Sequence, residues 1–219
     1  MTASPVEIPL FPLNTVLFPG MRLPLNIFEE RYKLMLKRCL EESAPFGIVL
    51  ISKGREAGEP AEPFSVGTTA RIISVEETDD GRFLLGVEGG MRFRIDEQLH
   101  RYPYIRASVS PFPYQEGNLD TRLVGQVQEL YREYGATALA MTGQWVKRME
   151  VPDDAEKLIN FVGARLSSAN AAKQRILEGP TMDQQMELAR DILRSECIAI
   201  RERFRNQQAQ RWWALSATN

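Results

Sequence analysis

The spacing of apolar residues changes near residue 117 of the chain. Before it, short segments alternate apolar and polar residues and prolines are frequent, whereas afterwards apolar residues recur every three or four positions. The first pattern is typical of half-buried strands and the second of amphipathic helices. Strands gathered in one half and helices in the other predict an α+β fold. We therefore expect two units, residues 1–116 and residues 117–219.

Several short strands are predicted in the first unit. Residues 66–75 and 82–87 flank Asp79-Asp80-Gly81, a sequence that suits the positive φ of a tight hairpin. Gly89-Gly90 predicts a further turn, and residues 91–95 then alternate apolar residues with arginine. The alternation at residues 91–95 predicts a strand with an apolar face and a basic face.

One helix interrupts the predicted strands. Apolar residues within residues 29–42 fall at i, i+3, i+4, i+7 and i+8, which indicates an amphipathic helix. Prolines in the first 25 residues lack the N–H that a central strand donates, so these segments belong at strand ends or sheet edges. About six short strands with a single helix favour a small closed or half-closed barrel.

The second unit reads as a bundle of helices. Residues 119–134 place apolar residues on one helical face. Asp153 with Glu156 resembles a capping box, and it precedes a helical pattern at residues 158–166. A last long helix is predicted from residues 181–204, with a shorter one before it.

Composition narrows the classes of function. The chain has 219 residues with 43% hydrophobic and 26% charged residues, which is ordinary for a folded globular protein. Its formal net charge of −2 argues against binding nucleic acid by bulk charge. No run of 18 apolar residues and no secretion signal occurs, so we expect no membrane partner and a cytoplasmic location. Cys39 and Cys197 read as reduced core residues.

No catalytic constellation stands out in the sequence. His100 is the single histidine, and one histidine with two distant cysteines cannot build a zinc site. The chain contains neither a P-loop motif nor a G-x-S-x-G nucleophile elbow. Neighbouring carboxylates fall at a hairpin turn, a helix start and a helix end. We expect no enzyme activity, no metal and no cofactor.

The proline-rich opening is a candidate peptide-binding surface. Prolines at a sheet edge leave apolar side chains near an exposed rim, where an extended peptide can dock. The alternative is a packed barrel end. The candidate residues are Phe11, Phe18, Pro19, Met21 and Phe28.

A basic and aromatic stretch is a second candidate surface. Arginine with aromatic rings can hold phosphate groups and stack bases, which would suit RNA. The alternative is the solvent face of a barrel. The candidate residues are Arg92, Arg94, Arg101, Tyr104 and Arg106.

Trp212-Trp213, behind several arginines, form a third candidate. This segment would dock on a partner, or pack back on the bundle or on a second copy of the chain.

Several motifs follow one another in a familiar order. Up to about residue 200 the chain resembles the N-terminal, substrate-binding domain of Lon proteases. The matching segments are I-P-L-F-P-L (8–13), V-L-F-P-G (16–20), L-P-L-N-I-F-E (23–29), V-G-T-T-A-R-I (66–72), L-G-V-E-G (85–89) with Arg92-Phe93, Y-P-Y (102–104) with Ala107 and Val109, and K-Q-R-I-L-E (173–178).

This resemblance implies a PUA-like pseudo-barrel followed by a helical bundle. In full-length Lon the unit precedes an ATPase module and a Ser-Lys peptidase module, and this chain stops where those would begin. The resemblance therefore implies a stand-alone, non-catalytic module that binds unfolded or extended polypeptide. A Lon-type protease and a second copy of the chain are further candidate partners. RNA binding by the PUA-like barrel is the alternative function, and a small-molecule pocket between strands is a third.

Overall fold

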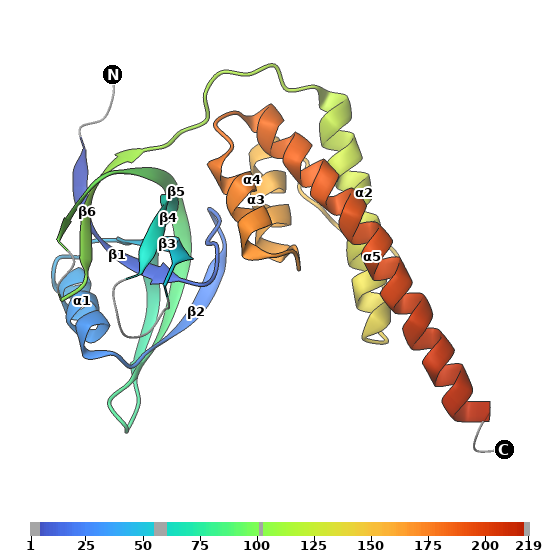
Figure 1. Cartoon of the computed structure of the whole chain (residues 1–219), viewed down its shortest axis with the longest axis horizontal. Helices are drawn as coiled ribbons and strands as arrows, with labels where there is room; N and C mark the ends of the chain where they lie inside the picture. Colours follow the sequence, from blue (N-terminus) through green and yellow to red (C-terminus); the bar gives the residue numbers. More distant parts are fainter. Residues whose placement is uncertain (1–4, 55–60, 101–102, 217–219) are drawn as a thin grey trace.

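The computed structural model describes residues 5–54, 61–100 and 103–216. Within them, strands occupy the first half and helices α2 to α5 occupy the second, so the predicted α+β class is confirmed (Figure 1). The strands are β1 (Val6–Leu13), β2 (Arg22–Ile27), β3 (Phe46–Lys53), β4 (Glu62–Glu77), β5 (Phe83–His100) and β6 (Ile105–Pro111). The helices are α1 (Glu30–Glu41), α2 (Thr121–Met141), α3 (Ala155–Arg165), α4 (Asn170–Glu178) and α5 (Met182–Ser216).

The strands close into a barrel. Their order is β2-β5-β4-β3-β1-β6, and an additional pairing of β5 with β6 joins the sheet to itself. β1 and β3 pair in parallel, whereas the other pairings between these six strands are antiparallel. The 18-residue strand β5 pairs with β2 through its first part and with β6 through its second part. Closure leaves β2 outside the ring, paired along one side.

The turn predicted at Gly89-Gly90 is wrong, because β5 runs through both residues. Gly89 serves close backbone approach instead of chain reversal. Gly89 donates its N–H to the carbonyl of Met21 at 2.8 Å, and a Cβ at position 89 would overlap the carbonyl of Phe18. A glycine inside a strand often marks such an approach by another segment.

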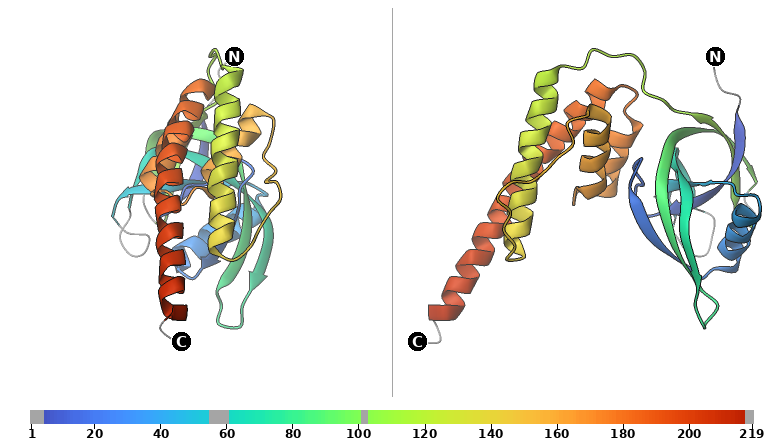
Figure 2. Two further views of the ribbon diagram at one scale, coloured as in Figure 1. Left: turned by 90° about the vertical axis from the view of Figure 1, so that its right-hand side faces the viewer. Right: turned by 180° about the vertical axis from the view of Figure 1, so that it is seen from behind.

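The helical half has two layers. Helices α2 and α5 lie side by side and run in the same direction, while α3 and α4 lie between this pair and the barrel (Figures 1 and 2). Helix α3 begins one residue later than the capping pattern predicted. The side chain of Asp154, not Asp153, accepts the N–H of Lys157 at 2.9 Å. No helix among the described residues has the length and apolar character needed to span a membrane.

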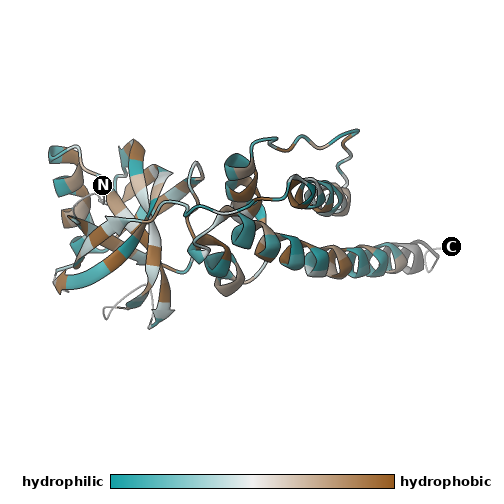
Figure 3. Cartoon of the chain, turned by 90° about the horizontal axis from the view of Figure 1, so that it is seen from above, coloured by the Kyte–Doolittle hydropathy of each residue, from teal (hydrophilic) through white to brown (hydrophobic). Residues whose placement is uncertain are grey.

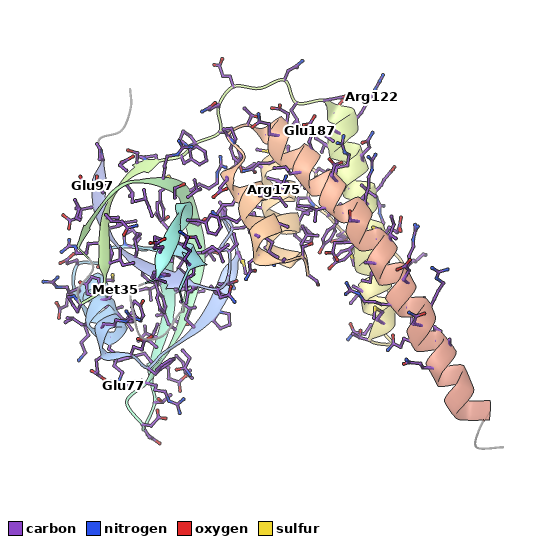
Figure 4. The ribbon with its side chains drawn as sticks, in the orientation of Figure 1. Met35, Glu77, Glu97, Arg122, Arg175 and Glu187 are labelled. Atoms are coloured by element: carbon purple, nitrogen blue, oxygen red, sulfur yellow. The ribbon has the colours of Figure 1, made fainter. Side chains whose placement is uncertain are left out.

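Buried side chains form three clusters. One lies between α1 and the strands and includes Met35, which Figure 4 labels on α1. A second lies among the strands around Phe93. The largest joins the helices to the barrel, because Phe18, Val66 and Phe112 share it with side chains from α2, α3, α4 and α5. One apolar core thus crosses the predicted boundary between residues 1–116 and 117–219.

A candidate polypeptide-binding groove

A groove of about 910 Å³ lies where the barrel meets the helical half. One wall is the segment that leads into β2, and the other is α3 with the residue Pro152 before it. The lining side chains are Pro19, Met21 and Arg22 on the barrel side, and Pro152, Asp154, Glu156, Lys157, Asn160, Phe161, Ala164 and Arg165 on the helical side. Both walls mix apolar side chains with charged ones.

Phe18 holds the barrel wall of the groove in place. Its side chain is 1% exposed and packs against α3 at Gly163, where a Cβ would overlap the ring. On the other side of the same segment, Gly20 donates its N–H to the carbonyl of Gly89 at 2.8 Å. The segment is therefore fixed between β5 and α3, and the residues that follow Phe18 are presented to the groove.

The charged side chains of the groove are nearly balanced in sign. The basic residues Arg22, Lys157 and Arg165 line it together with the acidic residues Asp154 and Glu156. This mixture favours neither an acidic nor a basic ligand. Specificity for a polyanion such as RNA would require a surface of one sign.

Apolar contact surface comes mainly from four side chains. Pro19 and Met21 lie on the barrel wall, and Phe161 and Ala164 lie on the helical wall; each is partly exposed. The guanidinium of Arg165 lies 3.9 Å from the centre of the Phe161 ring, which holds that ring at the edge of the groove. An extended chain with apolar side chains could therefore contact both walls.

A polar layer lies beneath the helical wall. Asn160 lines the groove although its side chain is only 8% exposed, and Tyr114 lies next to it. Burial raises the pKa of Tyr114, while the charge of Arg92 and the amide of Asn160 act in the opposite direction. The phenol is therefore neutral near pH 7, and it donates to the side-chain oxygen of Gln185 at 3.3 Å.

The predicted peptide-binding residues separate into three environments. Pro19 and Met21 line the groove. Phe28 is 56% exposed but lies at the other end of β2, roughly 20 Å from the groove by the rise of an extended strand. Phe11 and Phe18 are buried, at 6% and 1% exposed, so the expectation that they line an exposed rim is wrong.

The buried positions of these two rings have a simple cause. Phe11 packs against Tyr32 with ring centres 4.3 Å apart, which attaches α1 to the barrel. Phe18 attaches α3 in the same way. The helical wall was not predicted. The one indication of this wall in the sequence is Phe161, a large apolar residue that falls outside the buried stripe of Leu158, Ile159 and Val162.

Arg92 joins the two halves of the molecule and does not belong to a solvent-facing basic surface. It is 5% exposed, and its Nη1 donates to the carbonyls of Leu177 and Gly179, both at 2.8 Å. The guanidinium lies 4.0 Å from the ring centre of Tyr114. Desolvation lowers the pKa of Arg92, although a guanidinium keeps its charge at neutral pH. The prediction that Arg92 contacts phosphate is therefore wrong.

The other residues proposed for RNA do not form one surface. Tyr104 is 3% exposed, and its hydroxyl accepts from Arg38 at 3.2 Å. Arg106 pairs with Glu7 at 2.8 Å, and Arg94 stacks on Phe112 at 4.5 Å. Burial and pairing of these side chains give RNA binding no support.

Some predicted residues lie outside what the structure describes. Arg101 is not among the described residues. The same holds for the side chains of His100, Trp212 and Trp213. Among the described residues, no three side chains of histidine, cysteine, aspartate or glutamate gather as metal ligands would. Cys39 and Cys197 are buried and have free thiols.

The chain matches the family model of the ATP-dependent protease La (LON) substrate-binding domain over residues 7–195. Among curated proteins, the Lon protease of Cytophaga hutchinsonii is 26% identical over 187 residues, which is 80% of this chain and 22% of the relative. The Lon protease of Porphyromonas gingivalis is 29% identical over 188 residues, or 78% of this chain and 21% of the relative. The chain thus spans about a fifth of the length of these relatives.

Two solved structures share the fold. A Lon N-terminal domain protein from Xanthomonas campestris is 23% identical, with a TM-score of 0.61, and the match covers 83% of this chain and 95% of that one. The N-terminal domain of Lon protease from the Mycobacterium avium complex is 19% identical, with a TM-score of 0.64, and covers 86% and 98%. Since the family model spans most of the barrel and the bundle, the chain belongs to the Lon substrate-binding domain family.

Proposed function

We propose that the chain is a non-catalytic recognition module that holds unfolded or extended polypeptide in the groove between the barrel and α3. The groove is the observation that carries the proposal. It presents apolar side chains on both walls, its charges are nearly balanced, and it lies in a chain of the Lon substrate-binding family.

The edge of β2 offers an extended peptide a backbone partner. Among the described residues β2 pairs with β5 alone. Gly89 bonds the carbonyl of Met21, so by the alternation of a strand the backbone groups of Arg22, Pro24 and Asn26 point away from β5. Pro24 lacks an N–H at an edge where no strand requires one. A peptide can therefore add to this edge and continue into the groove.

The expected affinity is modest. Burying about 400 Å² of apolar surface contributes roughly 10 kcal/mol at about 25 cal/mol per Å². Ordering the peptide and losing its translational freedom offset most of this gain. We therefore expect micromolar dissociation constants and little dependence on the exact sequence of the peptide.

Fluorescence anisotropy with a labelled, reduced and carboxymethylated polypeptide tests the proposal. Met21→Glu and Ala164→Arg place charge on opposite walls of the groove, and each should weaken binding about tenfold because a charge is left in an apolar contact. Leu40→Glu is the matched control. Leu40 is 44% exposed on α1, on the far side of the barrel from the helices (Figure 1).

Two results would contradict the groove as the binding site. One is equal affinity for the unfolded polypeptide and for a scrambled polar peptide. The other is unchanged binding by both groove variants while Phe28→Ser weakens it, which would move the site to the far end of β2. Circular dichroism of every variant checks that the fold is kept.

A further inference from the structure

A second apolar surface lies on the helices, away from the groove. A hollow of about 770 Å³ is lined by the last turns of α2, the residues that follow it and the middle of α5. Trp145, Val146 and Ile198 line it and are 80%, 44% and 60% exposed. Exposed apolar patches with a charged rim mark protein contacts. The rim here includes Arg201, Glu202 and Arg205.

Two of these rim residues, Glu202 and Arg205, belong to a symmetric stripe along α5. Five exposed residues, spaced three, four, four and three apart, lie on one face of the helix: Asp191, Arg194, Ile198, Glu202 and Arg205. The order of their character is acidic, basic, apolar, acidic, basic. In Figure 3, hydrophilic and hydrophobic bands alternate along the coloured part of α5.

This stripe is complementary to itself in one orientation. When a second α5 runs antiparallel with Ile198 opposite Ile198, Asp191 meets Arg205 of the other copy and Arg194 meets its Glu202. The two-fold axis repeats each pair, so four opposite-charge contacts flank one apolar contact. In a parallel pairing in register, every charge would oppose its own kind.

Over its whole length, α5 is acidic in its first half and basic in its second half. Residues 182–199 contain four acidic and two basic residues, and residues 200–216 contain one acidic and four basic. The helix has 35 residues, about 52 Å. It extends beyond α2, since Gln207 bonds the carbonyl of Met141, the last residue of α2, at 3.3 Å. An antiparallel partner therefore has room beside its basic end.

We propose that the chain forms a two-fold symmetric dimer through antiparallel contact of the two α5 helices, centred on Ile198. Trp145 and Val146 of each copy extend the apolar centre. Within one copy, Asp191 accepts from Arg190 at 2.8 Å and lies 3.9 Å from Arg194. Exposed ion pairs within one helix contribute little stability. Asp191 can therefore exchange them for a pair with Arg205 of the second copy.

Sedimentation velocity over a concentration series tests the dimer. The wild-type chain should shift from 24.9 kDa towards twice that mass as its concentration rises. Asp191→Arg and Arg205→Asp should each weaken dimerisation about tenfold, because each creates two like-charge contacts. The double variant Asp191→Arg/Arg205→Asp should restore it, since the pairs are reversed but still complementary. Ile198→Glu should abolish it, and Leu40→Glu should leave it unchanged.

Cross-linking checks the orientation. Ile198→Cys in a chain with Cys39→Ala and Cys197→Ala should form a disulfide-linked dimer under oxidising conditions, because residue 198 of each copy lies at the two-fold axis.

A chain that stays monomeric at every concentration would overturn the proposal. So would a double reversal that stays as weak as the single variants. Loss of polypeptide binding by Ile198→Glu in a monomeric chain would assign the hollow to the peptide instead. Groove variants that bind no peptide but still dimerise would affect only the proposed function.

Discussion

At the scale of single residues, Phe18 determines the shape of the groove. Its ring is buried against α3 at Gly163, and its carbonyl lies against β5 at Gly89. The side chains that follow it are thereby presented to the groove. Both contacts require glycine, because a Cβ at position 163 would overlap the ring of Phe18 and a Cβ at position 89 would overlap its carbonyl. The position of Pro19 and Met21 therefore depends on residues distant in sequence.

Substitution of Gly163 tests this contact. Gly163→Ala should lower the free energy of unfolding by about 1–3 kcal/mol, because the new methyl group overlaps the Phe18 ring. Gly125→Ala on α2, where nothing but the helix's own adjacent backbone lies within 4 Å of the new Cβ, should raise it by about 1 kcal/mol. Urea denaturation measures both. In a Phe18→Leu background, Gly163→Ala should lower the free energy of unfolding by less. Strictly additive losses of stability would show that the Phe18 ring does not obstruct the new methyl group.

The buried thiol of Cys39 makes stability depend on alkaline pH. Burial raises the pKa of Cys39 from 9.0 to about 11, with the charge of Glu42 acting in the same direction. The unfolded thiol ionises from about pH 9, while the folded one keeps its proton, so stability should fall as the pH rises from 9 to 11. Urea denaturation of the wild type and of Cys39→Ala across this range measures the effect. Equal slopes for the two proteins would refute it.

At the scale of elements, helix α3 is the part that turns a barrel and a bundle into a binding site. Its buried stripe attaches it to the core, and its other side supplies Phe161 and Ala164 to the groove. The helix has 11 residues, which is short for a helix stable by itself in water. Its termini and its packing must therefore hold it in place.

The capping residue of α3 is a direct test. Asp154→Ala should destabilise the protein by about 1 kcal/mol, because the N–H of Lys157 loses its acceptor. Asp153→Ala should change stability by a few tenths of a kcal/mol, since its exposed carboxylate accepts only a long hydrogen bond, at 3.4 Å, from Gln128. Thermal unfolding followed by circular dichroism measures both. A larger effect at Asp153 would show that the helix begins where the sequence pattern placed it.

At the scale of the whole molecule, the two halves share one core. Phe18, Val66 and Phe112 of the barrel are buried among helical side chains. Polar contacts cross the same boundary, since Gln174 donates to the carbonyl of Val66 at 2.9 Å and Arg92 bonds two carbonyls of the helical half. These contacts bind α4 and its following turn to the barrel.

The shared core predicts a single unfolding transition. Amides in β4 and in α5 should exchange their hydrogens with the same free energy of opening under native conditions, because neither half keeps its core without the other. Arg92→Met should lower both values together, as a buried guanidinium hydrogen-bonded to two carbonyls is lost. Hydrogen exchange measured by mass spectrometry resolves the two halves. Separate opening energies would show that residues 1–116 and 117–219 are independent domains.

Much of the architecture was predictable because it follows local patterns. The 29–42 helix, the hairpin at Asp79-Asp80-Gly81 and the helices of the second half each arise from spacing or turn chemistry within a few residues. Gly89 was misread because the same residue type serves a turn and a close approach. Only the neighbouring backbone of Phe18 and Met21 distinguishes the two.

By itself the sequence determined the α+β class, the order of strands and helices and the family, since all three depend on local patterns and on their order along the chain. The tertiary structure alone decided which aromatic and basic side chains reach solvent. Burial depends on segments far apart in sequence: α1 covers Phe11, α3 covers Phe18, and the end of α4 covers Arg92. The groove exists for the same reason, because its two walls are separated by about 130 residues of chain and meet only when the core forms.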